Sequence, residues 1–544
     1  MRGKQFGSHD MLRALIVMVV LLAGSAQAEY EWDGVDRVVA FGDVHGAHEP
    51  LVELLVAAKM IDRNGHWRGG TAHLVSLGDL LDRGPGSRQT MDLLRALAPE
   101  AEAAGGRVHV LLGNHEAMNL TGDYRDVSAA AYAAFAAPDE PPDAEGLTGV
   151  AAYRAAHGPD GAYGAWLKTL PAIIRINRNV FTHGGLSGAL SGFSLEEINE
   201  ATRAELRARM AAPGVDAVGL WLGPDGPLWH RGNARCHALL EAPALARNLA
   251  AVGADRVVVG HTPTASHEVD LRLNGRVIAI DTGMLAEVYG GDAWALEISG
   301  AQLTAINARG GRVPLLPEAS EDVVLALTEG EIAEVDADLV ATIVLGTRSW
   351  RARFVPLGRK ARDRAVAAYR LDQLLGLDFV PATVARPVNG KQGVLVHEPT
   401  PVMSEDARRE REVFRPNFCA RGSAYELIAA FDALIGVVRD GHSLAYERGT
   451  WRLRALGNQN AFPGTSKLPA YARQPRLADE LARRLEALDV AALEASLSGL
   501  LKRNRINAIL KRRDAIMLWP RIGPVVPLDE RTVVEGAEKG AEAG

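Results

Sequence analysis

Side chains able to bind metals or move protons recur at the ends of short apolar stretches in the first half of the chain. The stretches include "VVAFGDVHG", "HLVSLGDLLDRG", "VHVLLGNHE", "NVFTHGG" and "RVVVGH". The polar residues that follow them are Asp43, His45, Asp79, Asp82, Asn114, His115, His183 and His261. Turn formation explains the neighbouring glycines, but it gives no reason for this set of carboxylates, imidazoles and an amide.

Two divalent cations explain the set. A pair of cations about 3.5–4 Å apart needs a bridging carboxylate together with neutral or anionic donors. Asp79 is the predicted bridge. The remaining ligands are predicted to be Asp43 and His45 for the first metal, and Asn114, His183 and His261 for the second. Because these stretches contain no thiolate, the donor set favours Mn, Fe or Zn over copper.

The elements that position these residues alternate along the chain. Apolar stretches predict strands, one of them at 108–112, and apolar residues at helical spacing predict helices at 49–60 and 87–97. A strand–helix–strand order implies parallel pairing through right-handed crossovers. Since ligand sites of such α/β folds lie at the carboxyl ends of the strands, the polar residues are expected to converge there.

Length and charge limit the class of protein. The chain has 544 residues, too many for one hydrophobic core, so two domains are expected. Its net charge of −7 argues against nucleic acid as a partner, because nucleic-acid-binding domains are usually strongly basic. The two cysteines, Cys236 and Cys419, lack the close spacing of a thiolate metal site.

The first 28 residues have the order of a secretory signal peptide. Basic residues precede an apolar run at 14–23, and Ala26 and Ala28 form a small-residue cleavage site. The run is roughly half the ~20 residues that a membrane-spanning helix needs. Cleavage after Ala28 would leave no membrane span, and an exported chain with few cysteines fits the periplasm.

The motifs GDVHG, GDLLDRG and GNHE, with the later HGG and GH, resemble the metallophosphoesterase superfamily and its phosphoprotein phosphatase branch. "EAMNLTGDYR" and "GPLWHRG" further resemble the bacterial Shewanella-like phosphatases, so that the resemblance covers about residues 36–300. It implies an α/β fold at 33–307, a four-layer α/β/β/α sandwich with ligands at the strand ends. It also implies two divalent metal ions and a phosphorylated protein or small phosphoester as substrate.

The resemblance also implies a mechanism, in which a metal-bridging hydroxide attacks phosphorus directly and no phosphoenzyme forms. His115 is expected to protonate the leaving group, a contribution typically worth about 10²–10⁴-fold, and Asp82 to hydrogen-bond His115. Arg83 is expected to hold the phosphoryl oxygens in a bidentate fork. Arg231, in "LWHRG", is a second candidate for this role, although a surface position beside a tryptophan is an equal alternative.

The rest of the chain divides into further predicted segments. Residues 117–171 are too many for a connecting loop and predict a cap beside the site, which would select substrates. The Gly- and Pro-rich stretch 308–320 predicts a linker, residues 321–527 a C-terminal α+β domain, and residues 528–544 a flexible tail.

The stretches 365–384 and 431–462 resemble bacterial proteins with a kinase-like fold related to phosphoinositide kinases. Such kinases need a lysine for the nucleotide phosphates and an aspartate for Mg²⁺. At the corresponding positions this chain has Val355 and Gly457. We therefore expect a degenerate kinase-like domain, with an unrelated α+β domain as the alternative.

Three functions remain open from the sequence. The leading hypothesis is an exported phosphomonoesterase acting on phosphoproteins, with serine/threonine and tyrosine esters both possible. A diadenosine tetraphosphate-type hydrolase would share the same site motifs and differ in its cap. An exported binding or scaffold protein, led by the C-terminal domain, would require a vestigial first half, and the full set of predicted ligands argues against that.

Overall fold

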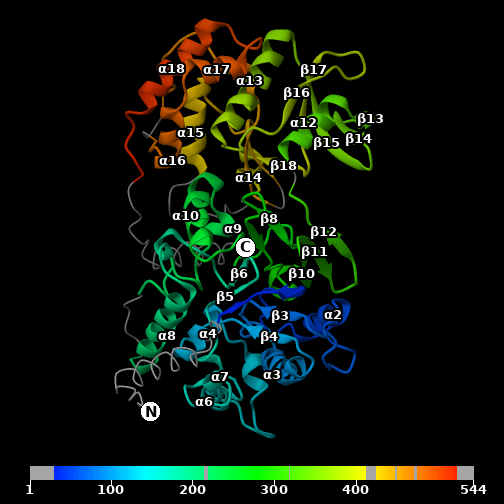
Figure 1. Cartoon of the computed structure of the whole chain (residues 1–544), viewed down its shortest axis with the longest axis vertical. Helices are drawn as coiled ribbons and strands as arrows, with labels where there is room; N and C mark the ends of the chain where they lie inside the picture. The colour runs from blue at the N-terminus through cyan, green and yellow to red at the C-terminus, as the bar shows by residue number, and fades with distance from the viewer. Residues whose placement is uncertain are drawn as a thin grey trace, which may run out of the picture.

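The computed structural model describes residues 30–212, 219–317, 319–411, 424–447, 450–470 and 475–522. The predicted signal peptide at 1–28, the predicted tail at 528–544 and Cys419 lie outside the described residues. Within these ranges, none of the helices has both the length and the apolar character that crossing a membrane requires. The two halves of the chain lie one above the other along the long axis (Figure 1).

The first sheet has six strands in the order β12-β11-β10-β2-β3-β4. Their bounds are β2 (Arg37–Phe41), β3 (His73–Ser76), β4 (Arg107–Val110), β10 (Trp294–Ser299), β11 (Gln302–Asn307) and β12 (Arg312–Pro314). Strands β2, β3 and β4 pair in parallel, and β10 pairs with β2 antiparallel. The predicted parallel order of the first three strands is confirmed.

The second sheet also has six strands, in the order β1-β5-β6-β7-β9-β8. Their bounds are β1 (Glu31–Trp32), β5 (Ile173–Ile176), β6 (Asn179–Thr182), β7 (Arg256–Val259), β8 (Asp270–Arg272) and β9 (Val277–Ala279). Strands β6 and β7, which precede two of the predicted metal ligands, are parallel neighbours. Their carboxyl ends therefore lie at the same edge of this sheet.

The two sheets pack face to face, with helices on the outer faces. In β2, Val38 and Ala40 pack against the second sheet, while Val39 and Phe41 pack under helices α2 (His48–Ala57) and α3 (Ser87–Ala103). Helices α8 (Leu195–Ala211) and α10 (Ala238–Ala251) cover the second sheet. Because side chains alternate along a strand, β2 is apolar from Val38 to Phe41 and buried on both faces. The predicted α/β fold with layers α/β/β/α is confirmed.

Short helices follow β4 and form the region predicted as a cap. These are α4 (Asn114–Leu120), α5 (Ala129–Ala133), α6 (Val150–His157) and α7 (Gly164–Leu167). Tyr132 and Tyr153, with Ala131, make a small apolar cluster of their own beside the main core. Three more short elements complete the first half: η1 (Gly188–Leu190), α9 (Gly232–Arg235) and α11 (Ala286–Tyr289).

The second half is an α+β region with a separate apolar core. Its larger sheet has the order β13-β14-β15-β17-β16, and its smaller sheet the order β18-β19-β20. The strands are β13 (Glu331–Val335), β14 (Val340–Leu345), β15 (Arg348–Pro356), β16 (Thr383–Ala385), β17 (Gly393–His397), β18 (Val402–Ser404), β19 (Leu444–Glu447) and β20 (Leu453–Ala455). The helices are α12 (Ser320–Glu329), α13 (Arg359–Leu375), α14 (Glu405–Glu410), α15 (Ala424–Ile435), η2 (Asn458–Asn460), α16 (Asp479–Glu486), α17 (Val490–Leu497) and α18 (Arg503–Ile516).

The predicted element bounds need some correction. The predicted linker at 308–320 contains strand β12, whose residues pair with β11, so the irregular connection is shorter than expected. The strand predicted at 108–112 is β4, which ends at Val110. Helix α2 ends three residues before the predicted 60, and the backbone of Lys59 is left-handed (φ 57°). Helix α3 continues past Pro99 to Ala103, and the other residues after the predicted end are alanine and glutamate, both good helix formers.

The turns after β3 and β4 touch through their glycines, and this contact predicts a substitution effect. Gly78 has φ +94°, and a Cβ added there would lie 2.4 Å from the backbone nitrogen of Gly113. Gly70 also has positive φ (+59°), but an added Cβ would meet nothing within 4 Å. Gly70→Ala should cost only the left-handed conformation, about 1–2 kcal/mol.

Gly78→Ala should cost roughly twice as much or more, because the backbone clash adds to the same conformational cost. The thermal unfolding midpoints of the two variants provide the measurement. Equal midpoints would show that the contact between the two turns is unimportant.

Candidate active site

The predicted metal-binding side chains lie together at the strand ends of the two sheets. Asp43 and His45 follow β2, Asp79 follows β3, and Asn114 begins α4 directly after β4. From the second sheet, His183 follows β6 and His261 follows β7. Each of these six residues is 4% exposed or less. The structure thus gathers all six predicted ligands in a buried position.

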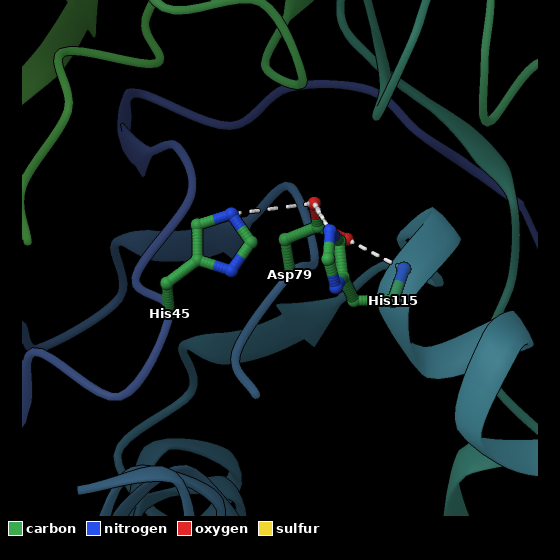
Figure 2. Close-up of side chains that lie close together, drawn as sticks. All are labelled: His45, Asp79 and His115. Carbon is green, nitrogen blue, oxygen red and sulfur yellow. Dashed lines mark hydrogen bonds and ion pairs between the residues drawn. The ribbon is translucent and has the colours of Figure 1, made fainter. Parts of the chain in front are cut away.

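Asp79 is the centre of this group. Its Oδ2 lies 3.2 Å from His183 Nε2, 3.7 Å from His45 Nε2 and 3.9 Å from His115 Nε2. Figure 2 shows His45 and His115 both turning a ring nitrogen toward the Asp79 carboxylate. Two sets of three residues have ligand atoms within 4.8 Å of one another: His45, Asp79 and His115, and Asp79, His183 and His261. Asp79 belongs to both sets.

Glu116 holds the turn that presents Asp79. Its carboxylate accepts hydrogen bonds of 2.8 Å from the backbone N–H groups of Asp79, Leu80 and Gly113. Asp79 needs such support because its φ of +52° is costly for a residue with a side chain. Burial, together with the charge of Asp79, raises the pKa of Glu116 to about 7. Glu116 therefore orients the backbone of this turn.

The other predicted ligands contact one another. Asn114 Oδ1 accepts a hydrogen bond from His183 Nε2 (2.8 Å), and Asp43 accepts one from the backbone N–H of His261 (2.9 Å). Asp281 interacts with Asp43 through a side-chain hydrogen bond. Burial, Asp281 and Asp79 raise the pKa of Asp43 well above its ordinary value. Burial also raises the pKa of Asp281, to about 6.

The arrangement fits divalent cations. Three carboxylates, those of Asp43, Asp79 and Asp281, are buried within one cluster, and buried carboxylates are stabilised by metals or by paired charges. The Nε2 atom of His261 is buried and has no hydrogen-bond partner, as expected of a nitrogen that binds a metal. Burial lowers the pKa of His45 to about 3, so that its imidazole is neutral and able to act as a ligand.

His115 lies beside this cluster in the geometry of a supported acid. Its Nδ1 is 2.6 Å from Asp82 Oδ2, and its backbone N–H donates to Asp79 Oδ1 (3.0 Å). Burial acts to lower the pKa of His115, but the carboxylates of Asp79 and Asp82 outweigh this and raise it. Both carboxylates thus stabilise the imidazolium form relative to the neutral ring, and Nε2 faces the carboxylate of Asp79 (3.9 Å).

The two arginines singled out in the sequence both reach the site. Arg83 Nη1 lies 3.0 Å from His45 Nε2, and its guanidinium lies 5.4 Å from the ring centroid of Tyr289. Arg231 Nη1 donates to the backbone carbonyl of His261 (2.7 Å), and burial lowers the pKa of Arg231 to about 10. The surface position considered for Arg231 is wrong, because the segment 230–235 packs against the turn after β7.

Three further residues of the site were missed in the sequence. Asn119 Nδ2 donates to Asp82 (2.9 Å), and its Oδ1 accepts from the Tyr153 hydroxyl (2.9 Å). The ring of Tyr289 stacks on His45, with centroids 5.6 Å apart. Asn119 could have been found, since it lies four residues after His115 on the same face of α4. Tyr153 and Tyr289 carry no such local signal.

About half of this chain is similar to known proteins. The model of the calcineurin-like phosphoesterases matches residues 36–265. Shewanella-like protein phosphatase 1 of Plasmodium berghei is 32% identical over 289 residues, which is 52% of this chain and 77% of that protein. Shewanella-like protein phosphatase 2 of Arabidopsis thaliana is 30% identical over 309 residues, which is 50% of this chain and 78% of that protein.

Among solved structures, the cold-active protein-tyrosine phosphatase of a psychrophilic Shewanella is 30% identical, with a TM-score of 0.45 over 52% of this chain and 82% of that one. Fold and site together define a metallophosphoesterase, a hydrolase of phosphate esters. The chain belongs to the Shewanella-like protein phosphatase family within the calcineurin-like phosphoesterases, which confirms the resemblance noted in the sequence.

Asp79→Asn should abolish both metal binding and hydrolysis, because a neutral amide cannot bridge two dications as a carboxylate would. Elemental analysis of the purified variant measures the metal, and release of phosphate from p-nitrophenyl phosphate measures activity. Asp92→Asn is the matched control, since the Asp92 carboxylate accepts from Tyr163 in the cap (2.7 Å) and belongs to neither metal-type set. A variant at 79 with two metals per chain and normal turnover would disprove the bridging role.

Proposed function

We propose that this chain is a dinuclear metal-dependent phosphomonoesterase that acts on phosphoproteins. The observation that supports it most is the place of Asp79, which belongs to both sets of metal-type ligands. Asp43 and His45 would hold one cation, and Asn114, His183 and His261 the other, with Mn, Fe or Zn suited to these donors. When bound, two such cations activate a water molecule and neutralise the phosphoryl oxygens.

The chain's own residues supply the remaining chemistry. Arg83 places a guanidinium at the rim of the cluster, where its planar fork suits two phosphoryl oxygens better than the point charge of a lysine. Arg231 is the second candidate for this contact. His115, paired with Asp82 at 2.6 Å, is positioned to protonate the leaving oxygen. Attack and departure would then occur without a covalent enzyme intermediate.

The relatives favour phosphoproteins over other phosphate esters. Two of them, from Plasmodium berghei and Arabidopsis thaliana, are named as protein phosphatases. The match to the calcineurin-like phosphoesterases spans residues 36–265, a range that contains the proposed site residues. The cap formed by α5, α6 and α7 lies beside the site and is where we expect selection among esters. We further propose export to the periplasm, on the signal-peptide pattern of residues 1–28.

His115→Asn should leave the metals bound but lower turnover by roughly 10²-fold or more on esters with poor leaving groups. An alkyl phosphate needs protonation of its leaving oxygen, whereas an aryl phosphate of low leaving-group pKa needs little. Steady-state rates on the two esters measure the difference. Equal losses on both would show that His115 is not the acid.

For the second half we propose recognition or regulation of the phosphatase and no phosphate transfer. Val355 and Gly457, the residues found where a kinase would need its lysine and metal-binding aspartate, line one cavity of about 190 Å³. A fragment of residues 315–530 should therefore show no Mg²⁺-dependent ATP binding by calorimetry. Tight ATP binding with phosphate transfer to an acceptor would instead identify an active kinase.

A further inference from the structure

A chain of buried hydrogen bonds connects the cap to the proposed acid. The Tyr153 hydroxyl of α6 donates to Asn119 Oδ1 (2.9 Å), and Asn119 Nδ2 donates to both oxygens of Asp82 (2.9 and 3.1 Å). Asp82 in turn pairs with His115 Nδ1 (2.6 Å). Tyr153, Asn119 and Asp82 are completely buried, and His115 is 3% exposed. No water is therefore needed to complete this network.

The direction of the Asn119 amide is set on both sides: its NH₂ group donates to Asp82 and to the backbone carbonyl of His115 (3.0 Å), and its oxygen accepts from Tyr153. An asparagine side chain has a donating end and an accepting end, and only the donating end can face a carboxylate. Burial raises the pKa of the Tyr153 hydroxyl, which therefore keeps its proton and donates to the oxygen of Asn119. This places the NH₂ group toward Asp82. A reversed amide would bring two oxygen acceptors together and leave the hydroxyl without its acceptor, a costly arrangement in a buried site.

The cap in turn holds Tyr153 in place. The ring of His157 stacks on it with centroids 4.0 Å apart, and the rings of Tyr132 and Phe135 pack edge-on at 5.0 and 5.1 Å. These contacts come from α5, α6 and the turn after α5. We infer that Tyr153 is a positioning residue of the cap, which orients the acid His115 through Asn119 and Asp82. The inference rests on the proposed role of His115 as the acid.

Tyr153→Phe tests this inference, because it removes the hydroxyl and keeps the ring. Turnover on an alkyl phosphate should fall about tenfold with KM unchanged, while an aryl ester of low leaving-group pKa should lose less than about twofold. Tyr132→Phe, which removes the hydroxyl of another buried tyrosine in the same cluster, should leave both rates unchanged. Asn119→Leu should likewise lose more turnover on the alkyl phosphate than on the aryl ester. It replaces Tyr153→Phe in the test if that variant folds poorly.

A double variant separates positioning from structural support. If Tyr153 acts through His115, Tyr153→Phe should cause no further loss in a chain that already contains His115→Asn. A loss of the same size in both backgrounds, or equal losses on the two esters, would overturn the inference while leaving His115 as the acid. Absence of leaving-group selectivity in His115→Asn alone would instead overturn the acid assignment and this inference with it.

A second, independent observation concerns the cavity of about 190 Å³ in the second half. It lies between the paired strands β15 and β17 and the segment that follows β20. Its walls are mainly aliphatic and include Val355, Leu357, Val380, Val394, Val396 and Leu456. Val355 and Val394 face each other as a pair in the register of the two strands. An apolar cavity of about 150 Å³ is large enough for benzene, so this one suits one or two fused rings.

The arginines of this cavity are held by carboxylates. Arg353 donates to Glu398 through Nε (2.6 Å) and Nη2 (2.8 Å), and Arg454 donates to Glu447 through Nε (2.6 Å). A phosphate or carboxylate ligand would have to displace a carboxylate from one of these pairs, which is costly at the buried pair of Arg454 and Glu447. The lining contains one hydroxyl oxygen, Thr400 Oγ1, that is buried without a hydrogen-bond partner.

We propose that this cavity binds an uncharged aromatic molecule of one or two rings, able to accept or donate one hydrogen bond. Indole is the probe, and indole-3-carboxylate is its charged counterpart, each titrated into the full chain by calorimetry. Indole should bind once per chain, and the carboxylate about tenfold more weakly or worse. Failure of indole to saturate, or equal affinity of the two probes, would overturn the proposal.

Substitutions locate the binding. Val355→Phe fills the cavity and should weaken indole binding about tenfold or more. Ala455→Leu, at a fully buried position of the lining, should do the same and serves where Val355→Phe unfolds. Val438→Phe adds the same ring at a 76% exposed position outside the lining and should leave affinity unchanged. Unchanged binding by both cavity variants would show that indole binds elsewhere.

Discussion

The burial of the Asp79 carboxylate among three imidazoles is the interaction on which the first half depends. Burial acts to raise the pKa of Asp79, but the imidazoles of His183 and His115 outweigh it and hold this pKa well below its ordinary value. The Asp79 carboxylate is therefore held in its anionic form, which is the form that binds cations. Three features hold Asp79 in this position. They are the packing of the two sheets, the hydrogen bond from the Asp79 backbone N–H to Glu116, and the close contact of the turns at Gly78 and Gly113.

Much of this arrangement could be predicted from the sequence, because each metal-type residue follows a strand by a fixed short turn. The position of Asp43, His45 or Asn114 depends only on its strand and on parallel pairing, and both are local patterns. Tyr153 and Tyr289 could not be predicted in this way. They reach the site from the cap and from a short helix after β9, and their positions depend on packing between segments far apart in the chain.

The second half contacts the first next to the same site. His237 Nε2 lies 2.6 Å from the backbone carbonyl of Leu377, and the rings of His237 and Phe379 lie 4.8 Å apart. Leu239 of α10 belongs to the apolar core of the second half. The segment just before His237 includes Arg231, which donates to the carbonyl of the predicted metal ligand His261. The second half is therefore linked to the turn after β7 through the segment 231–237.

The cap and the second half thus act on different parts of one centre. The cap reaches Asp82 and the proposed acid His115 through Tyr153 and Asn119, whereas the segment 231–237 contacts the turn that presents His261. On the proposed mechanism, a substitution in the cap would act on proton transfer by His115 and leave the proposed metal ligands in place. On the proposed mechanism, a substitution that disturbs the turn after β7 would act on the proposed ligand His261 and would reduce turnover on every ester alike. The dependence of a variant's activity on the leaving group therefore tells which of the two regions it has altered.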